Sequence, residues 1–76
     1  MVMGNKIFKL EDTLVVIGAA IIKALAKGPA RLDDLYLATE SHYPKKLKFD
    51  RFVYAVDFLY MIGKVDIEKD DVLVLR

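Results

Sequence analysis

The sequence has no cysteine, no tryptophan and no glutamine, and it has one histidine and one serine. The lack of cysteine excludes disulfide scaffolds, zinc fingers, iron–sulfur centres and thiol nucleophiles. With a single imidazole, any metal chemistry would have to rest on carboxylates. The four glycines stand isolated at positions 4, 18, 28 and 63, so no glycine-rich phosphate cradle is present. These absences argue against an enzyme, and we expect no catalytic residue, no metal site and no cofactor.

An excess of charge of one sign and a long apolar run are also missing. The chain has 12 Lys and Arg residues against 11 Asp and Glu, a net charge of +1, which excludes a highly basic nucleic-acid coat and an acidic tail. The longest apolar run covers residues 14–22, whereas a bilayer-spanning helix needs about 20 residues. The first residues lack the apolar core of a signal peptide. We therefore expect a cytoplasmic protein without a membrane partner.

Apolar surface is what the chain has in excess. Its 76 residues are enough for one small domain, residues 1–76. Hydrophobic residues make up 55% of the chain, above the roughly 45–50% of an average soluble domain. A domain of this size buries only about 60% of the surface that its unfolded chain exposes. More apolar side chains are present than one small core can hide, so we expect a protein partner or self-association.

Apolar spacing and helix-stop signals predict three helices, over residues 11–27, 32–41 and 48–62. Glu11 and Asp12 suit the first turn of the first helix, where the helix dipole favours negative charge. Gly28 and Pro29 follow its last turn, and Gly63 follows the third helix. A glycine directly after a helix is a common terminator because it tolerates the left-handed backbone.

The segments outside the helices complete an α+β fold. Residues 1–10 are expected to form an extended arm or short strand, and residues 30–32 a brief extended bridge. Residues 64–76 alternate around a polar turn and predict a C-terminal β-hairpin. Three helices followed by a two-stranded wing predict a winged helix-turn-helix, and the bridge falls where such folds place their first strand.

The third helix has two apolar faces. Six residues fall within one arc and are expected in the core: Phe49, Phe52, Val53, Val56, Leu59 and Tyr60. A second patch lies on the other side: Tyr54, Phe58, Met61 and Ile62. Phe58 lies about 180° from Phe49, so core packing should not need it. Stranded aromatic residues mark a partner site more often than a bare surface, and the alternative is that residues 1–10 cover this patch.

Two further apolar residues lie among polar positions. Val16 falls on the polar side of the first helix, and Leu37 lies opposite the inner face of the second. Together with the patch on the third helix they form the predicted partner-binding set. Its members are Val16, Leu37, Tyr54, Phe58, Met61 and Ile62.

One basic cluster lies between the second and third helices, where winged helices contact phosphates: Lys45, Lys46, Lys48 and Arg51. Four cations are enough for weak, salt-sensitive nucleic-acid binding. A solvated loop and a patch for an acidic partner are equally open interpretations. Only Arg51 could read bases from the outward face of the third helix, and Asp50 and Asp57 would repel phosphates. Sequence-specific DNA binding is therefore not favoured.

Several stretches resemble one family. The run Phe49-Asp50-Arg51-Phe52, residues 55–63 after it, and residues 10–14 and 32–36 are similar to the middle component 6 family of bacterial three-component ABC systems. The resemblance covers residues 6–76. It implies a small protein encoded between an ABC-type ATPase and a larger third protein, acting as an adaptor in a conflict or defence system. It implies no catalytic residue.

The leading hypothesis is a non-catalytic interaction subunit that binds a larger protein, or a second copy of itself, through its first and third helices. The ABC-type ATPase and its associated third component are the partners that the resemblance implies. The alternative is a small dimeric winged-helix transcriptional regulator that uses the basic cluster for phosphates. Expressed alone, the protein is expected to be dimeric or larger, or poorly soluble, because its apolar patches would otherwise stay exposed.

Overall fold

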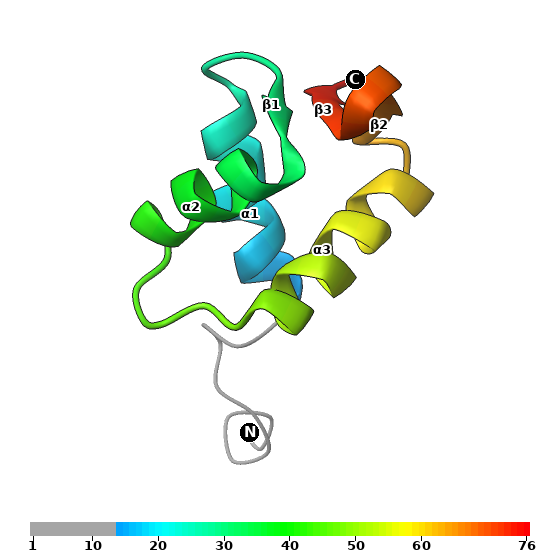
Figure 1. Ribbon diagram of the computed structural model, residues 1–76. Helices are drawn as coiled ribbons and strands as arrows, with labels where there is room; N and C mark the ends of the chain where they lie inside the picture. The colour runs from blue at the N-terminus through cyan, green and yellow to red at the C-terminus, as the bar shows by residue number, and fades with distance from the viewer. Residues whose placement is uncertain (1–13) are drawn as a thin grey trace.

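The computed structural model describes residues 14–76; the predicted arm and the start of the first helix lie outside the described residues. Three helices and a small antiparallel sheet confirm the predicted α+β class (Figure 1). The elements are α1 Leu14–Leu25, β1 Ala30–Arg31, α2 Leu32–Ser41, α3 Phe49–Met61, β2 Val65–Glu68, a 3-10 turn Lys69–Asp71, and β3 Val72–Leu75.

The helix ends follow the sequence signals closely. α1 ends at Leu25, two residues before the predicted end, and the Gly28 N–H donates a hydrogen bond to the Leu25 carbonyl at 2.9 Å. Gly28 has a φ of 137°, a value that side-chain-bearing residues rarely adopt. α2 matches its predicted range, while Lys48 and Ile62 are the caps of α3 and not helical residues.

The sheet joins the bridge after α1 to the C-terminal hairpin. Its strand order is β1-β3-β2, and both pairings are antiparallel. Ala30 pairs with Leu73 on one side of β3, and on the other side Val65 pairs with Leu75 and Glu68 with Val72. The predicted hairpin is therefore part of a three-stranded sheet that covers one end of the helices (Figure 1).

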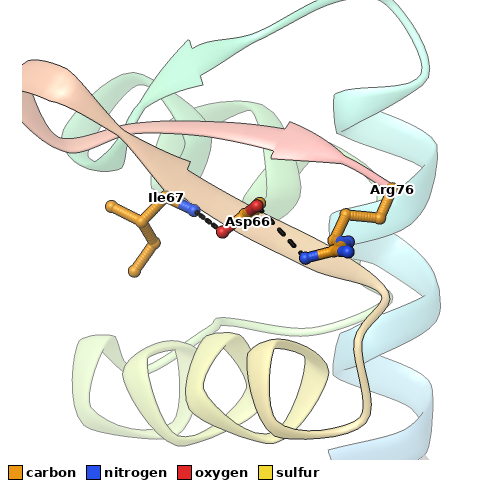
Figure 2. Close-up of polar contacts among 3 residues, drawn as sticks. All are labelled: Asp66, Ile67 and Arg76. Atoms are coloured by element: carbon orange, nitrogen blue, oxygen red, sulfur yellow. Dashed lines mark hydrogen bonds and ion pairs between the residues drawn. The ribbon is translucent and has the colours of Figure 1, made fainter.

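The open end of the β2–β3 hairpin is closed by polar contacts (Figure 2). Arg76 Nη1 lies 3.2 Å from Asp66 Oδ2, and the Arg76 N–H donates to the Lys64 carbonyl at 3.0 Å. Asp66 Oδ1 also accepts a hydrogen bond from the Ile67 N–H at 3.0 Å. Because both side chains of the ion pair are exposed, it contributes less than about 1 kcal/mol. The backbone ladder and apolar contacts hold the hairpin together.

The core lies where the three helices meet the sheet. Its largest fully buried apolar side chains come from all three helices, the loop before α3, and strands β2 and β3. They are Ile17, Ile21, Leu35, Leu47, Phe52, Val65 and Leu73. Gly18 of α1 is buried against the Leu59 side chain of α3. A Cβ at position 18 would lie 3.4 Å from the Leu59 side chain, in ordinary contact, so α1 and α3 pack closely here. The first turn of α1 lies beside the outer face of α3, where Leu14 approaches Tyr54 and Phe58.

The buried face of α3 is rotated from the predicted one. Its buried residues are Phe52, Ala55, Val56 and Leu59. The prediction was wrong for Phe49 and Tyr60, which are 49% and 51% exposed. Phe52 and Leu59 lie at the centre of the buried face, and Ala55 forms the edge that is farthest from Phe49. Alanine carries little weight in a hydrophobic pattern, so the sequence placed the centre too near Phe49.

One buried hydroxyl is unsatisfied, and it gives a stability prediction. Thr39 is fully buried, and its Oγ1 has no hydrogen-bond partner within residues 14–76. An unsatisfied buried polar group costs about 1–3 kcal/mol. We expect Thr39→Val, which keeps the shape and removes the hydroxyl, to raise the free energy of unfolding by about 1 kcal/mol.

The measurement is urea unfolding followed by circular dichroism. Thr39→Ser serves as the control, because it keeps the hydroxyl and removes only the methyl group. Loss of one buried methyl group should lower the free energy of unfolding by about 1 kcal/mol. A Thr39→Val variant less stable than the original protein would contradict the prediction.

Candidate interaction surfaces

A shallow apolar groove follows the outer face of α3 to the first turn of α1. Its volume is about 610 Å³, and its lining residues are Leu14, Arg51, Tyr54, Asp57, Phe58 and Met61. Positions 51, 54, 58 and 61 share one side of the helix because they are three or four residues apart. Tyr54 and Met61 are 61% and 81% exposed. We call this site the outer groove; it combines exposed apolar side chains with one cation and one carboxylate.

Half of the predicted partner-binding set meets in the outer groove: Tyr54, Phe58 and Met61. The other three residues do not line it. Ile62 is the half-exposed C-cap of α3, and Val16 is half-buried in α1. Leu37 is 63% exposed on α2. The structure therefore brings three of the six residues together on α3. The partner-binding role of Val16, Leu37 and Ile62 stays a prediction for each residue by itself.

Phe58 and Leu14 connect the outer groove to the core. Phe58 is half-buried and packs against the core cluster, in contrast to the expectation that core packing should not need it. Leu14 of α1 packs against the core and also lines the groove. The apolar spacing within one helix cannot show that a residue contacts both the core and the groove, because this depends on how α1 lies against α3.

The four predicted cations meet in a separate hollow of about 170 Å³. Its lining residues are Tyr43, Lys45, Lys46, Leu47, Lys48 and Arg51. Leu47 is 1% exposed, and its carbonyl accepts a hydrogen bond from the Tyr36 hydroxyl at 2.7 Å. A buried leucine between two lysines therefore anchors the loop from inside. Sequence analysis missed Leu47, although a lone leucine among lysines was the available signal.

Two carboxylates, Asp50 and Asp57, lie on α3 beyond the basic hollow. The Asp50 carboxylate accepts a hydrogen bond from the Arg51 N–H at 2.8 Å, so it occupies the first turn of α3. An anion approaching this helix end would meet that negative charge. Arg51 is the one basic residue within Phe49–Met61. The cations therefore gather in the loop before α3, and the helix itself adds only Arg51 to them.

Within residues 14–76, no three His, Cys, Asp or Glu side chains are placed to hold a metal ion together. No helix in this part of the chain has the length and apolar character required to cross a membrane. His42 is exposed at the end of α2, and the neighbouring Ser41 hydroxyl donates to the Ala38 carbonyl at 2.7 Å. Ser41 is thus engaged locally at the helix end.

These features define a small α+β protein that presents an apolar groove and a basic hollow, which meet at Arg51 near the start of α3. The chain belongs to the family of Middle Component 6 of ABC-three component (ABC-3C) systems, whose model matches residues 5–76. The resemblance seen in the sequence is therefore confirmed, and the protein is one component of a multi-protein system. Comparisons with curated proteins and with solved structures gave no match.

Proposed function

We propose that this protein is a non-catalytic interaction subunit that binds a larger component of its ABC three-component system through the outer groove. The larger component is the ABC-type ATPase or the third protein of a bacterial conflict or defence system. The observation that carries the proposal is the exposure of Tyr54 and Met61 on the side of α3 that faces away from the core. Membership of a middle-component family supports it, since such a component works with other proteins.

The order of elements supports a winged-helix type for this subunit. A short strand stands between α1 and α2, and the β2–β3 hairpin follows α3 with β3 in the middle of the sheet. In this arrangement α3 takes the position of the recognition helix of helix-turn-helix proteins. Here its outer face is apolar, so we infer that it contacts a protein where other winged helices contact DNA.

The energetics favour a protein occupant for the outer groove. Aromatic residues, methionine and arginine are enriched in the cores of protein interfaces. Burying a side chain such as Met61 contributes about 1.5–3 kcal/mol. Arg51 and Asp57 lie beside the apolar residues, and opposite charges on a partner would set its orientation more than its affinity.

The test compares two tyrosines of the same helix. Tyr54 lines the outer groove, whereas Tyr60 has similar exposure and does not line it. We expect Tyr54→Ala to weaken binding to the partner by about 2 kcal/mol, close to 30-fold, as for an aromatic anchor. Isothermal titration against the purified ATPase and the purified third protein, one at a time, measures the effect.

Tyr60→Ala is the matched control and should leave the affinity within about two-fold of the original value. Thermal unfolding of both variants checks that neither has lost its fold. Equal affinities for the two variants would remove the outer groove as the contact site, as would binding of neither purified protein by the unmodified chain.

A second function is favoured by one observation, the meeting of four cations in one hollow. A dimeric DNA-binding regulator would use these cations for phosphates. Its signature is duplex binding that weakens steeply between low and moderate salt, together with a dimer in light scattering. Such a result would favour the regulator over the interaction subunit.

A further inference from the structure

A second groove lies between α3 and the β2–β3 hairpin, and it borders the outer groove at Asp57. Its residues come from four elements, α2, α3, β2 and β3, and from the turn between β2 and β3; they include Leu32, Val53, Asp57, Ile67, Asp71 and Leu73. This hollow, of about 140 Å³, continues past Leu32 and Asp71 into a second hollow of about 240 Å³. We call the two together the wing groove.

The floor of the wing groove is apolar and partly open to solvent. Ile67 is 48% exposed, and in Figure 2 its side chain extends from β2 on the side of α3. Phe49, at the far end of the groove, is 49% exposed although its ring packs edge-on against Tyr36 with centroids 5.1 Å apart. Val53 and Leu32 are half-buried. Side chains of this kind gain free energy from a partner that covers them.

The rim of the wing groove is acidic. Asp33, Asp57 and Asp71 line it, with Arg31 as the one cation among its lining residues. This charge balance is the opposite of the basic hollow beside Lys45 and Lys46. Carboxylates repel phosphate groups and attract Lys and Arg, so the charge selects against nucleic acid and in favour of a basic segment.

The backbone brings Asp71 to this rim by an uncommon conformation. Asp70 and Asp71 are consecutive residues with φ values of 62° and 59°. Positive φ is uncommon for residues other than glycine, and a residue held there costs about 1–3 kcal/mol. Such positions persist where the surrounding structure requires them. Here the turn places one carboxylate over the groove and the other away from the groove lining.

We propose that the wing groove is a second docking site, which takes a basic and apolar segment of a partner protein. An aliphatic or aromatic side chain of that segment covers Ile67 and Val53, and flanking Lys or Arg residues pair with Asp57 and Asp71. The site is separate from the outer groove, since only Asp57 lines both. Two separate sites would give this small subunit the means to connect two proteins.

The experiment uses short overlapping peptides that together cover the ABC-type ATPase and the third protein of the system. Binding of each peptide to the whole chain is measured by fluorescence anisotropy at low salt. The peptides that bind should carry net positive charge and at least one large apolar residue. Asp71→Asn should weaken them by about three- to five-fold, the scale of one exposed ion pair.

Asp70→Asn is the matched control for Asp71→Asn. It removes the same charge from the same turn, in the same backbone conformation, at a position that does not line the groove. Asparagine tolerates positive φ well, so neither variant should disturb the turn. Asp70→Asn should leave peptide affinity unchanged. Ile67→Thr, which keeps a β-branched residue on the strand, should weaken the same peptides by at least as much as Asp71→Asn.

Four results would overturn the proposal. Two concern the peptides: none binds, or those that bind are neutral or acidic. Two concern the variants: Asp71→Asn and Asp70→Asn have the same peptide affinity, or Asp71→Asn weakens only self-association. The last result would assign the groove to a second copy of the chain. Failure of the outer groove gives a different pattern. In that case Tyr54→Ala has no effect on the intact partner, while peptide binding still depends on Asp71.

Discussion

Replacing Phe52 by alanine is expected to unfold most of the protein at room temperature. Phe52 is fully buried, and its ring packs edge-on against Tyr36 with centroids 5.2 Å apart. Removing a buried phenylalanine side chain costs about 3–5 kcal/mol. A domain below roughly 80 residues rarely has more than about 3–5 kcal/mol of stability from its core. The loss therefore matches the whole free energy of unfolding.

Phe58→Ala on the other side of α3 provides the comparison. Because Phe58 is half-buried and packs on the core from one side only, we expect about half the loss of Phe52→Ala. Urea unfolding followed by circular dichroism measures both variants. If Phe58→Ala unfolds the protein as completely as Phe52→Ala, the outer face of α3 belongs to the core, and the outer groove is no partner site.

Leu47→Ala is expected to have the second largest effect, although Leu47 lies in a loop. Its side chain is 1% exposed within the core cluster, and its carbonyl accepts the Tyr36 hydroxyl hydrogen bond. The cavity left by removing a buried leucine costs about 2–5 kcal/mol. Differential scanning calorimetry should show a melting temperature lower by at least about 10 °C, given roughly 4–8 °C per kcal/mol for a domain of this size.

Leu37→Ala is the control for the same chemical change at the surface. Leu37 is 63% exposed on α2, and exposed substitutions usually change stability by no more than about 0.5 kcal/mol. The two variants should therefore melt many degrees apart. A melting temperature for Leu47→Ala equal to that of Leu37→Ala would show that the loop is not anchored through Leu47. Other contacts would then fix the position of the basic residues around the hollow.

The sequence was most informative about the number, order and ends of the elements, because these depend on local signals. Gly28 ends α1 through its own backbone preference, and the apolar spacing along α3 needs no knowledge of the rest of the chain. The centre of a buried face is not local. It depends on which neighbouring elements approach most closely, and on α3 the buried face extends to Ala55 while Phe49 remains half-exposed.

The same distinction applies to the candidate sites. Tyr54, Phe58 and Met61 belong to one helix, so their shared face could be predicted from spacing alone. Leu14 joins them only through the packing of α1 on α3. The wing groove could not be predicted, since it unites α3 with Asp71 from a turn whose position is set by the pairing of β3. Surfaces made within an element are visible in a sequence, and those made between elements are not.

The central place of β3 also shapes how the sheet opens. Within residues 14–76, β1 and β2 do not pair with each other, and each is hydrogen-bonded to β3. Ala30 is far from Leu73 along the chain, so the β1–β3 pairing closes a long loop at a considerable cost in chain entropy. Once β3 detaches, neither neighbour has a partner strand. Detachment of β3 therefore breaks both pairings of the sheet at once, whereas the two-residue edge strand β1 can open without disturbing the β2–β3 hairpin.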